Sequence, residues 1–240
     1  MTQIAIVLYP QFTALDFIGP YEVLRALPDT EVRFVWHEPG PVVADSGVLV
    51  VGATHSFDET PSPDVVLVPG GPGFLAASQD EKVLDWLRAV RPGAQWTTSV
   101  CTGSIILAAA GLLDGKPATT HWSSMAGLTL HGAKAVSDQR IVRAAPDDDL
   151  VTAAGVSAGI DLALWLAEQI AGRARAEAIQ LIIEYDPQPH LDSGHRSKAS
   201  AKTIATSTML LSRDVDKPEM VKSSVRLLWD RALTKVRSGR

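Results

Sequence analysis

The sequence predicts an α/β protein with a doubly wound, mostly parallel sheet and helices on both faces. Short β-prone runs alternate with segments of helical apolar spacing from residue 4 to residue 185. Strands such as 65–68 are apolar without interruption, as expected for a strand that is covered on both faces. Together, the alternation and the buried strands favour the doubly wound arrangement over a segregated or all-helical one.

Each predicted element follows from its local pattern. The predicted strands are 4–9, 31–37, 64–69, a run that ends near Cys101, 118–121, and a pair at 140–144 and 150–153 around a Pro-Asp-rich turn. The predicted helices are 15–27, 83–90, 105–110, 122–130, 159–171 and 175–185. Residues 186–200, rich in Pro, Ser, His and Gly, are interpreted as a linker or extended arm, and 220–236 as a final helix.

Length and composition favour one main globular unit. The 240 residues are 46% hydrophobic and 20% charged, enough to bury one substantial core. We therefore interpret 1–186 as the α/β domain and 187–240 as a basic linker with a C-terminal helical extension. A single cysteine excludes an internal disulfide framework and a cysteine-based zinc cluster. We expect no metal or cofactor, no signal peptide or membrane span, and a soluble protein in the reducing cytoplasm.

Charge is distributed unevenly along the chain. Residues 1–186 contain 11 Lys and Arg against 22 Asp and Glu, whereas residues 187–240 contain 11 against 5. A basic tail can bind nucleic acid, but this one has no aromatic-rich or Arg-rich run, so we favour a solvated or subunit-packing extension on an acidic body.

Three features with possible chemistry follow predicted strands, where ligands bind in open parallel sheets. They are Asp16 after the first strand, the glycine-rich turn 70–73 after the third, and Cys101 after the fourth. Each has an ordinary explanation when taken alone. A lone cysteine is most often a small buried hydrophobe, an aspartate there is most often a helix cap, and such glycines are common in tight turns.

Their convergence favours a functional interpretation. A thiol at the start of a helix lies in the field of unpaired N–H groups, which favours the thiolate and makes Cys101 a candidate nucleophile. Asp16, beside that thiolate, would stay protonated and act as an acid and then a base. The glycine turn would present N–H groups to developing negative charge.

Several segments together resemble the DJ-1/PfpI superfamily, and within it the isocyanide hydratases most closely. They are LDFIGP (15–20), EPGPV (38–42), VPGG (68–71), TSVCTGS (98–104), ATTHW (118–122) and AGID (158–161). The resemblance extends from residue 4 to about residue 186, and the Cys-Thr-Gly and Thr-Thr-His-Trp segments are its most specific parts.

The resemblance implies a flavodoxin-like homodimer with its nucleophile on a strained strand-to-helix elbow. Cys101 would be that nucleophile, Asp16 its acid/base partner, and Thr102 would orient one of them. Backbone N–H groups at Gly71 and Thr102 would face the reacting group, with Gly70 in the same turn. Trp122 is expected to contribute to the substrate pocket.

The residue after the cysteine separates the activities found among such relatives. Protease-like and amidotransferase-like members have a histidine there, whereas this chain has Thr102. His121 is the remaining histidine candidate, and we expect it to support the site or a dimer interface. The implied activity is the addition of water to an isocyanide, which gives an N-substituted formamide through a covalent thioimidate, with a small-molecule isocyanide as substrate.

Three alternatives stay open at this stage. A glyoxalase-like or deglycase enzyme would use the same nucleophile on a reactive carbonyl compound. Some relatives are transcription regulators with a pair of helix-turn-helix units, but the 55 residues after Tyr185 are few for such a pair, so we do not expect nucleic acid as a partner. An accessible thiolate could also serve as a redox sensor.

Overall fold

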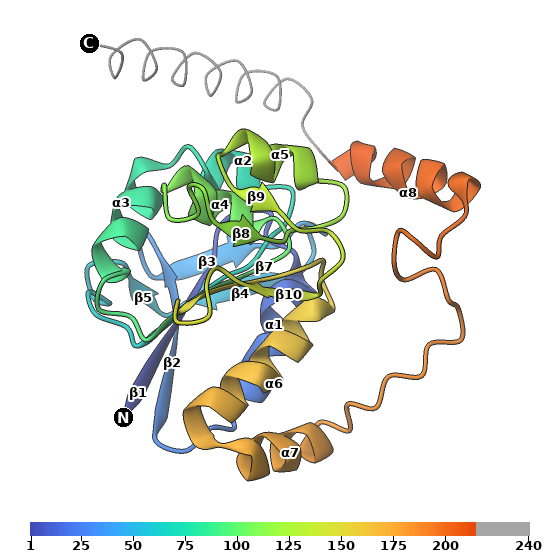
Figure 1. Cartoon of the computed structure of the whole chain (residues 1–240). Coiled ribbons are helices and arrows are strands. Elements are labelled where there is room, and N and C mark those ends of the chain that lie inside the picture. The colour runs from blue at the N-terminus through green and yellow to red at the C-terminus, as the bar shows by residue number, and fades with distance from the viewer. Residues whose placement is uncertain (215–240) are drawn as a thin grey trace.

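The computed structural model describes residues 1–214, and its centre is a seven-stranded sheet in the order β10-β11-β7-β6-β1-β2-β5 (Figure 1). Neighbouring strands run parallel except for the antiparallel edge pair of β10 and β11. The strands of this sheet are β1 (Thr2–Val7), β2 (Thr30–Trp36), β5 (His55–Ser56), β6 (Val65–Val68), β7 (Trp96–Val100), β10 (Ile141–Arg143) and β11 (Leu150–Ala153). The predicted doubly wound sheet is confirmed.

Two small two-stranded sheets lie beside the main one. They consist of β3 (Gly40–Val43) with β4 (Val50–Ala53), which are antiparallel, and β8 (Pro117–Ala118) with β9 (Lys134–Ala135), which are parallel. The hairpin of β3 and β4 had no counterpart among the predicted strands. It is short and half exposed, and the apolar run 48–51 that leads into β4 was not assigned to a strand.

Helices cover both faces of the sheet (Figure 1). The helices are α1 (Ala14–Leu24), α2 (Phe74–Ala77), α3 (Glu81–Val90), α4 (Gly103–Ala109), α5 (Met125–Leu130), α6 (Ala158–Ala171), α7 (Arg173–Ile182) and α8 (Ala201–Asp214). Helices α1 and α6 pack together on one face, whereas α4 packs on β6 and β7 with α3 and α5 beside it. The six predicted helices all form, with ends shifted by a few residues.

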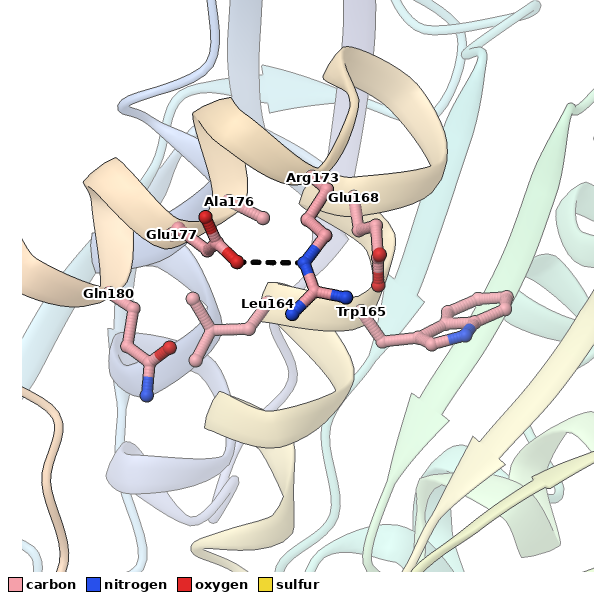
Figure 2. Close-up of a pocket in the computed structure, with 7 residues that line it drawn as sticks. All are labelled: Leu164, Trp165, Glu168, Arg173, Ala176, Glu177 and Gln180. Atoms are coloured by element: carbon pink, nitrogen blue, oxygen red, sulfur yellow. Dashed lines mark hydrogen bonds and ion pairs between the residues drawn. The ribbon is translucent and has the colours of Figure 1, made fainter.

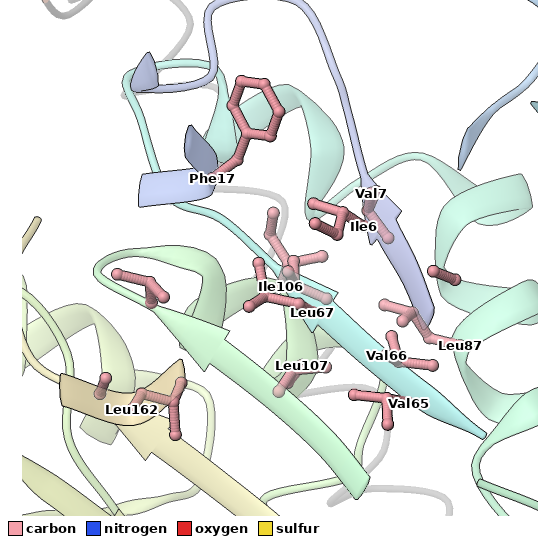
Figure 3. Close-up of a cluster of buried hydrophobic side chains, with 14 of the residues drawn as sticks. Ile6, Val7, Phe17, Val65, Val66, Leu67, Leu87, Ile106, Leu107 and Leu162 are labelled. Carbon is pink, nitrogen blue, oxygen red and sulfur yellow. The ribbon is translucent and has the colours of Figure 1, made fainter. Parts of the chain in front are cut away.

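The core lies between the sheet and these helices. Figure 3 shows Ile6 and Leu67 from the central strands meeting Ile106 of α4, with Leu87 of α3 and Leu162 of α6 at its sides. All five side chains are fully buried. Burial on both faces explains why β6 contains no polar residue.

The order of the strands positions the candidate site. The chain moves from β1 to β2 on one side, and then crosses to β6 and β7 on the other side of β1. The carboxyl ends of β7, β6 and β1 are therefore neighbours at the point where the winding reverses, which is where open α/β sheets bind ligands.

Beyond α7 the chain forms an extended arm over residues 183–200, and then α8 (Figure 1). Residues 186–200, interpreted as a linker from the sequence, have irregular structure, and α8 was missed. The Thr- and Ser-rich run that forms α8 has weak helix propensity, so its sequence does not stand out. The predicted helix at 220–236 lies outside the described residues.

Candidate active site

Cys101 lies between β7 and α4 in a strained backbone conformation. Its φ is 58°, in the left-handed region that residues with a side chain seldom adopt. Its N–H donates to the carbonyl oxygens of Ala153 and Ala154, at 3.2 and 2.9 Å. Its carbonyl oxygen accepts from the hydroxyls of Thr120 and Ser104, at 2.9 and 3.1 Å. Such strain persists only where surrounding bonds impose it, and it is concentrated at functional positions.

Asp16 is not a helix cap but a buried acid. It is the third residue of α1, whose N-cap is Thr13, and its side chain has no solvent exposure. Oδ2 accepts the N–H of Gly70 at 2.8 Å, and Oδ1 has no hydrogen-bond partner of normal geometry among residues 1–214. Burial raises the pKa of Asp16 to about 7, although the Gly70 N–H and the Cys101 thiol act to lower it.

The Cys101 sulfur is the immediate neighbour of this carboxyl group. The residue is 6% exposed, and burial raises the pKa of the thiol well above its ordinary value, with a further increase from the Asp16 charge. The backbone N–H groups of Val156 and Thr102 act in the opposite direction, because they donate to the sulfur. The position at a helix start favours a thiolate, but the sequence does not reveal the burial that opposes it.

The charges of Cys101 and Asp16 affect each other. Two negative charges in one buried space repel each other, so Asp16 ionises near pH 7 while the thiol keeps its proton, and above that pH the two groups hold one proton between them. In one arrangement a thiol lies beside a carboxylate, and in the other a thiolate lies beside a carboxylic acid. The second arrangement places a nucleophile and a proton donor side by side.

The glycine turn at 70–73 holds the Asp16 carboxyl group and the neighbouring Thr102 hydroxyl by hydrogen bonds. The Gly70 N–H donates to Asp16, and the Gly71 N–H donates to the Thr102 hydroxyl at 3.0 Å. A Cβ at Gly70 would lie 2.5 Å from the Thr102 nitrogen and 2.8 Å from Asp16 Oδ2, so only glycine fits there. The turn was expected to present open N–H groups, but in this structure the Gly70 and Gly71 N–H groups hold Asp16 and Thr102. The N–H groups that reach the sulfur are those of Thr102 and Val156.

A cavity of about 470 Å³ lies beside the pair. Its wall includes Thr120, His121, Trp122, Met125, Arg140 and Val156. Thr120 and Val156 each also bond to Cys101, so the cavity adjoins the residue that would react. Cys101 itself is not part of the wall.

His121 and Trp122 are part of the wall of this cavity. The Nδ1 atom of His121 is 2.7 Å from the Ser123 hydroxyl, and burial lowers the pKa of the ring. A Cβ at Gly155 would lie 2.5 Å from His121 Cδ2, so the ring packs directly on the loop that ends at Val156. This arrangement suits a neutral, supporting histidine.

A second depression, between α6 and α7, contains no comparable chemistry. The depression has a volume of about 370 Å³, and Figure 2 shows Arg173 paired with Glu177 of the same helix, at 2.7 Å, with Trp165 of α6 also on the wall. No nucleophile lines it. Among residues 1–214, no group of three or more His, Cys, Asp or Glu side chains is arranged to hold a metal ion.

Sequence reasoning missed the contributions that come from the backbone. The N–H of Val156 reaches the sulfur, and the carbonyl groups of Ala153 and Ala154 hold the Cys101 N–H. Because backbone groups are present at every position, no residue type marks them. The positive φ of Val156, 29°, is a structural sign that this loop is constrained.

The model of the DJ-1/PfpI family matches residues 2–169, the segment that contains the sheet, Asp16 and Cys101. The chain belongs to the DJ-1/PfpI family. It is 45% identical over 202 residues to the isonitrile hydratase of Pseudomonas putida, which covers 84% of this chain and 86% of that protein. Isonitrile is another name for isocyanide.

Two further similarities concern a regulator and a solved structure. The chain is 31% identical over 170 residues to the HTH-type transcriptional regulator CdhR of Pseudomonas aeruginosa, which covers 69% of this chain but 49% of the regulator. A solved THiJ/PfpI family protein from Pseudomonas syringae matches with a TM-score of 0.84 and 34% identity, over 94% of this chain and 90% of that one. Among residues 1–214, no helix is long and apolar enough to span a bilayer.

Proposed function

We propose that this protein is an isocyanide hydratase with Cys101 as nucleophile and Asp16 as acid and base. The observation that carries the proposal is a buried thiol beside a buried carboxyl group, each with a raised pKa. The similarity to an isonitrile hydratase over most of both chains supports the choice of substrate class. The residue after the nucleophile is Thr102, so no adjacent histidine supplies a base.

In the first step, the thiolate form of Cys101 attacks the terminal isocyanide carbon, and a C–S bond forms. That carbon carries a lone pair, which takes the proton from the carboxylic acid of Asp16. The product is a thioimidate, in which the former isocyanide carbon is bonded to sulfur and hydrogen and doubly bonded to nitrogen. The N–H groups of Thr102 and Val156 hold the sulfur in place.

In the second step, Asp16 is a carboxylate and draws a proton from a water molecule as its oxygen attacks the thioimidate carbon. The C=N electron pair moves to nitrogen, which takes up the other proton of the water. The C–S bond then breaks, the sulfur leaves as a thiolate, and the N-substituted formamide is released. Asp16 keeps one proton, so the pair returns to its starting state.

We also propose a homodimer that forms through the hairpin of β3 and β4. Val48 and Val50 are 87% and 53% exposed, and Leu15 of α1 is exposed nearby. The hairpin is attached beside α1, because Asp45 accepts the Thr13 hydroxyl at 2.7 Å. Exposed apolar residues on a fixed hairpin are typical of an interface. Val48→Asp should shift the mass measured by light scattering from two chains to one, whereas an unchanged mass would exclude this interface.

The reaction is tested with an alkyl isocyanide in D₂O, with the product followed by NMR and the protein by intact mass spectrometry. The formyl carbon should carry deuterium, because its hydrogen comes from the exchangeable Asp16 proton. Cys101→Ala should abolish turnover, and Asp16→Asn should lower kcat by about 100-fold or more. Asp58→Asn, the same change at an exposed position, is the control.

The same assay separates this activity from the glyoxalase alternative. Methylglyoxal is offered in parallel, and we expect no turnover of it at concentrations that saturate the isocyanide reaction. Full activity of Cys101→Ala on the isocyanide would refute the mechanism. The free thiol must stay reduced to attack, which agrees with a cytoplasmic location.

A further inference from the structure

The extended arm between α7 and α8 passes over the cavity beside Cys101. Gly194, His195 and Arg196 of this arm are part of the cavity wall, although they follow the last strand by more than 40 residues. The guanidinium carbon of Arg196 lies 5.9 Å from the centre of the Trp122 ring, which is a cation–π contact. A cation on an aromatic ring at this distance holds the arm against the wall.

Hydrogen bonds within the arm also fix its conformation next to Arg196. The Nδ1 atom of His195 lies 2.7 Å from the Ser197 hydroxyl and 3.2 Å from the Ser197 nitrogen, which shapes the turn that carries Arg196. A smaller cavity of about 50 Å³ separates Trp122 from Thr203 and Ile204 at the start of α8. Trp122 therefore faces the arm on one side and α8 on another.

The other end of the arm is tied to the same region of the molecule. The hydroxyl of Tyr185, where α7 gives way to the arm, donates to Asp161 at 3.0 Å. Asp161 also pairs with Arg140, and Arg140 lies on the cavity wall. The arm is thus anchored at its start by Tyr185 and near its end by Arg196, and both anchors are linked to residues of the cavity wall.

The cavity that the arm closes is connected to the reacting residue through two shared groups. Thr120 and Val156 are part of its wall, and they bond to the carbonyl oxygen and the sulfur of Cys101 respectively. A substituent on the substrate that extends away from the sulfur on this side meets Trp122 and Met125, and behind them the arm.

We propose that the 194–196 segment is the outer wall of the pocket for the N-substituent of the isocyanide, and that the contact of Arg196 with Trp122 limits the size of that substituent. The inference rests on the proposed hydratase function. It assigns alkyl or aromatic isocyanides as the preferred substrates, because Trp122 and Met125 offer apolar surface, and the fixed arm sets the limit on how far their substituents extend.

The test compares kcat/KM for a compact substrate, isopropyl isocyanide, with that for a bulky one, 1-adamantyl isocyanide. Arg196→Ala should raise the bulky-to-compact ratio about fivefold, the factor that corresponds to roughly 1 kcal/mol. Arg196→Lys keeps the cation and should keep the ratio within about twofold of the starting protein, since a lysine also makes the contact. Arg175→Ala, an exposed arginine of α7, is the matched control and should leave the ratio unchanged.

A second measurement follows the arm without turnover. Hydrogen exchange of the amides of residues 190–198 should become faster in Arg196→Ala and in Trp122→Leu, and remain unchanged in Arg175→Ala. Equal exchange in all variants, or a ratio unchanged in Arg196→Ala, would overturn the role of the arm and leave the hydratase proposal standing. If the unaltered protein turned over neither isocyanide, both proposals would be overturned together.

Discussion

The raised pKa of Asp16 predicts that replacing this acid changes how stability depends on pH. In the folded protein the carboxyl group is buried beside Cys101 and holds its proton up to about pH 7, whereas its ordinary pKa is 3.8. Asp16→Asn replaces it with a neutral amide of nearly the same shape, whose oxygen can still accept the Gly70 N–H. The variant therefore removes the titration while it preserves the packing.

The folded protein binds the Asp16 proton more tightly than the unfolded chain does. This group therefore favours folding most at pH values below about 4, where Asp16 is protonated in both states. The advantage is lost progressively as the pH rises toward 7, because the unfolded chain ionises freely and the buried group does not. At about 1.4 kcal/mol for each pH unit, the interval from 3.8 to about 7 corresponds to about 4 kcal/mol.

The measurement is urea unfolding from pH 4 to pH 8 at one fixed protein concentration, since an oligomer's stability depends on concentration. The free energy of unfolding of Asp16→Asn, relative to the unaltered protein, should rise across this range by about 4 kcal/mol. Asp58→Asn removes an exposed carboxylate and is the control. Parallel pH profiles for the unaltered protein and Asp16→Asn would refute a buried, protonated Asp16, and with it the proton donor on which the mechanism depends.

Two further predictions concern the supports of the site and of the sheet edge. Thr102→Val leaves the buried N–H and carbonyl of Gly71 without their partner and should cost about 1–3 kcal/mol in urea unfolding, whereas Thr102→Ser retains the hydroxyl and most of the stability. Burial raises the pKa of Asp148, but Lys116 at 2.8 Å and the Leu150 N–H outweigh this and hold it below its ordinary value. Asp148→Asn should therefore lower the melting temperature at pH 7 and lose that effect as the pH falls below about 4, whereas an equal loss at both pH values would contradict the ionic contribution.

Local pattern was sufficient for most of the fold. The apolar run at 65–68 and the alternation of strands with helical segments identified a sheet covered on both faces, and the antiparallel pair around residues 146–149 was also found. The hairpin of β3 and β4 and helix α8 were not found. Helix α8 is largely exposed, so its sequence contains little of the periodic apolar signal on which such predictions depend, whereas the apolar run 48–51 that leads into β4 was not assigned to a strand.

Part of the candidate site could also be predicted. Cys101, Asp16 and the glycine turn were expected at one edge of the sheet, because parallel strands bring their carboxyl ends together. The roles of their neighbours were not accessible in the same way. That the Gly71 N–H holds Thr102, and that Val156 reaches the sulfur, depends on the path of the backbone in three dimensions.

The sequence by itself determined the class of fold and the two candidates for the reacting pair, since strand patterns and the chemistry of thiol and carboxyl groups are properties of the local chain. Only the tertiary structure decided the protonation of that pair and the boundaries of the neighbouring cavity. Burial and charge repulsion depend on groups far apart in the chain, such as Asp16 and Cys101 in the pair, or Trp122 and Arg196 on the wall.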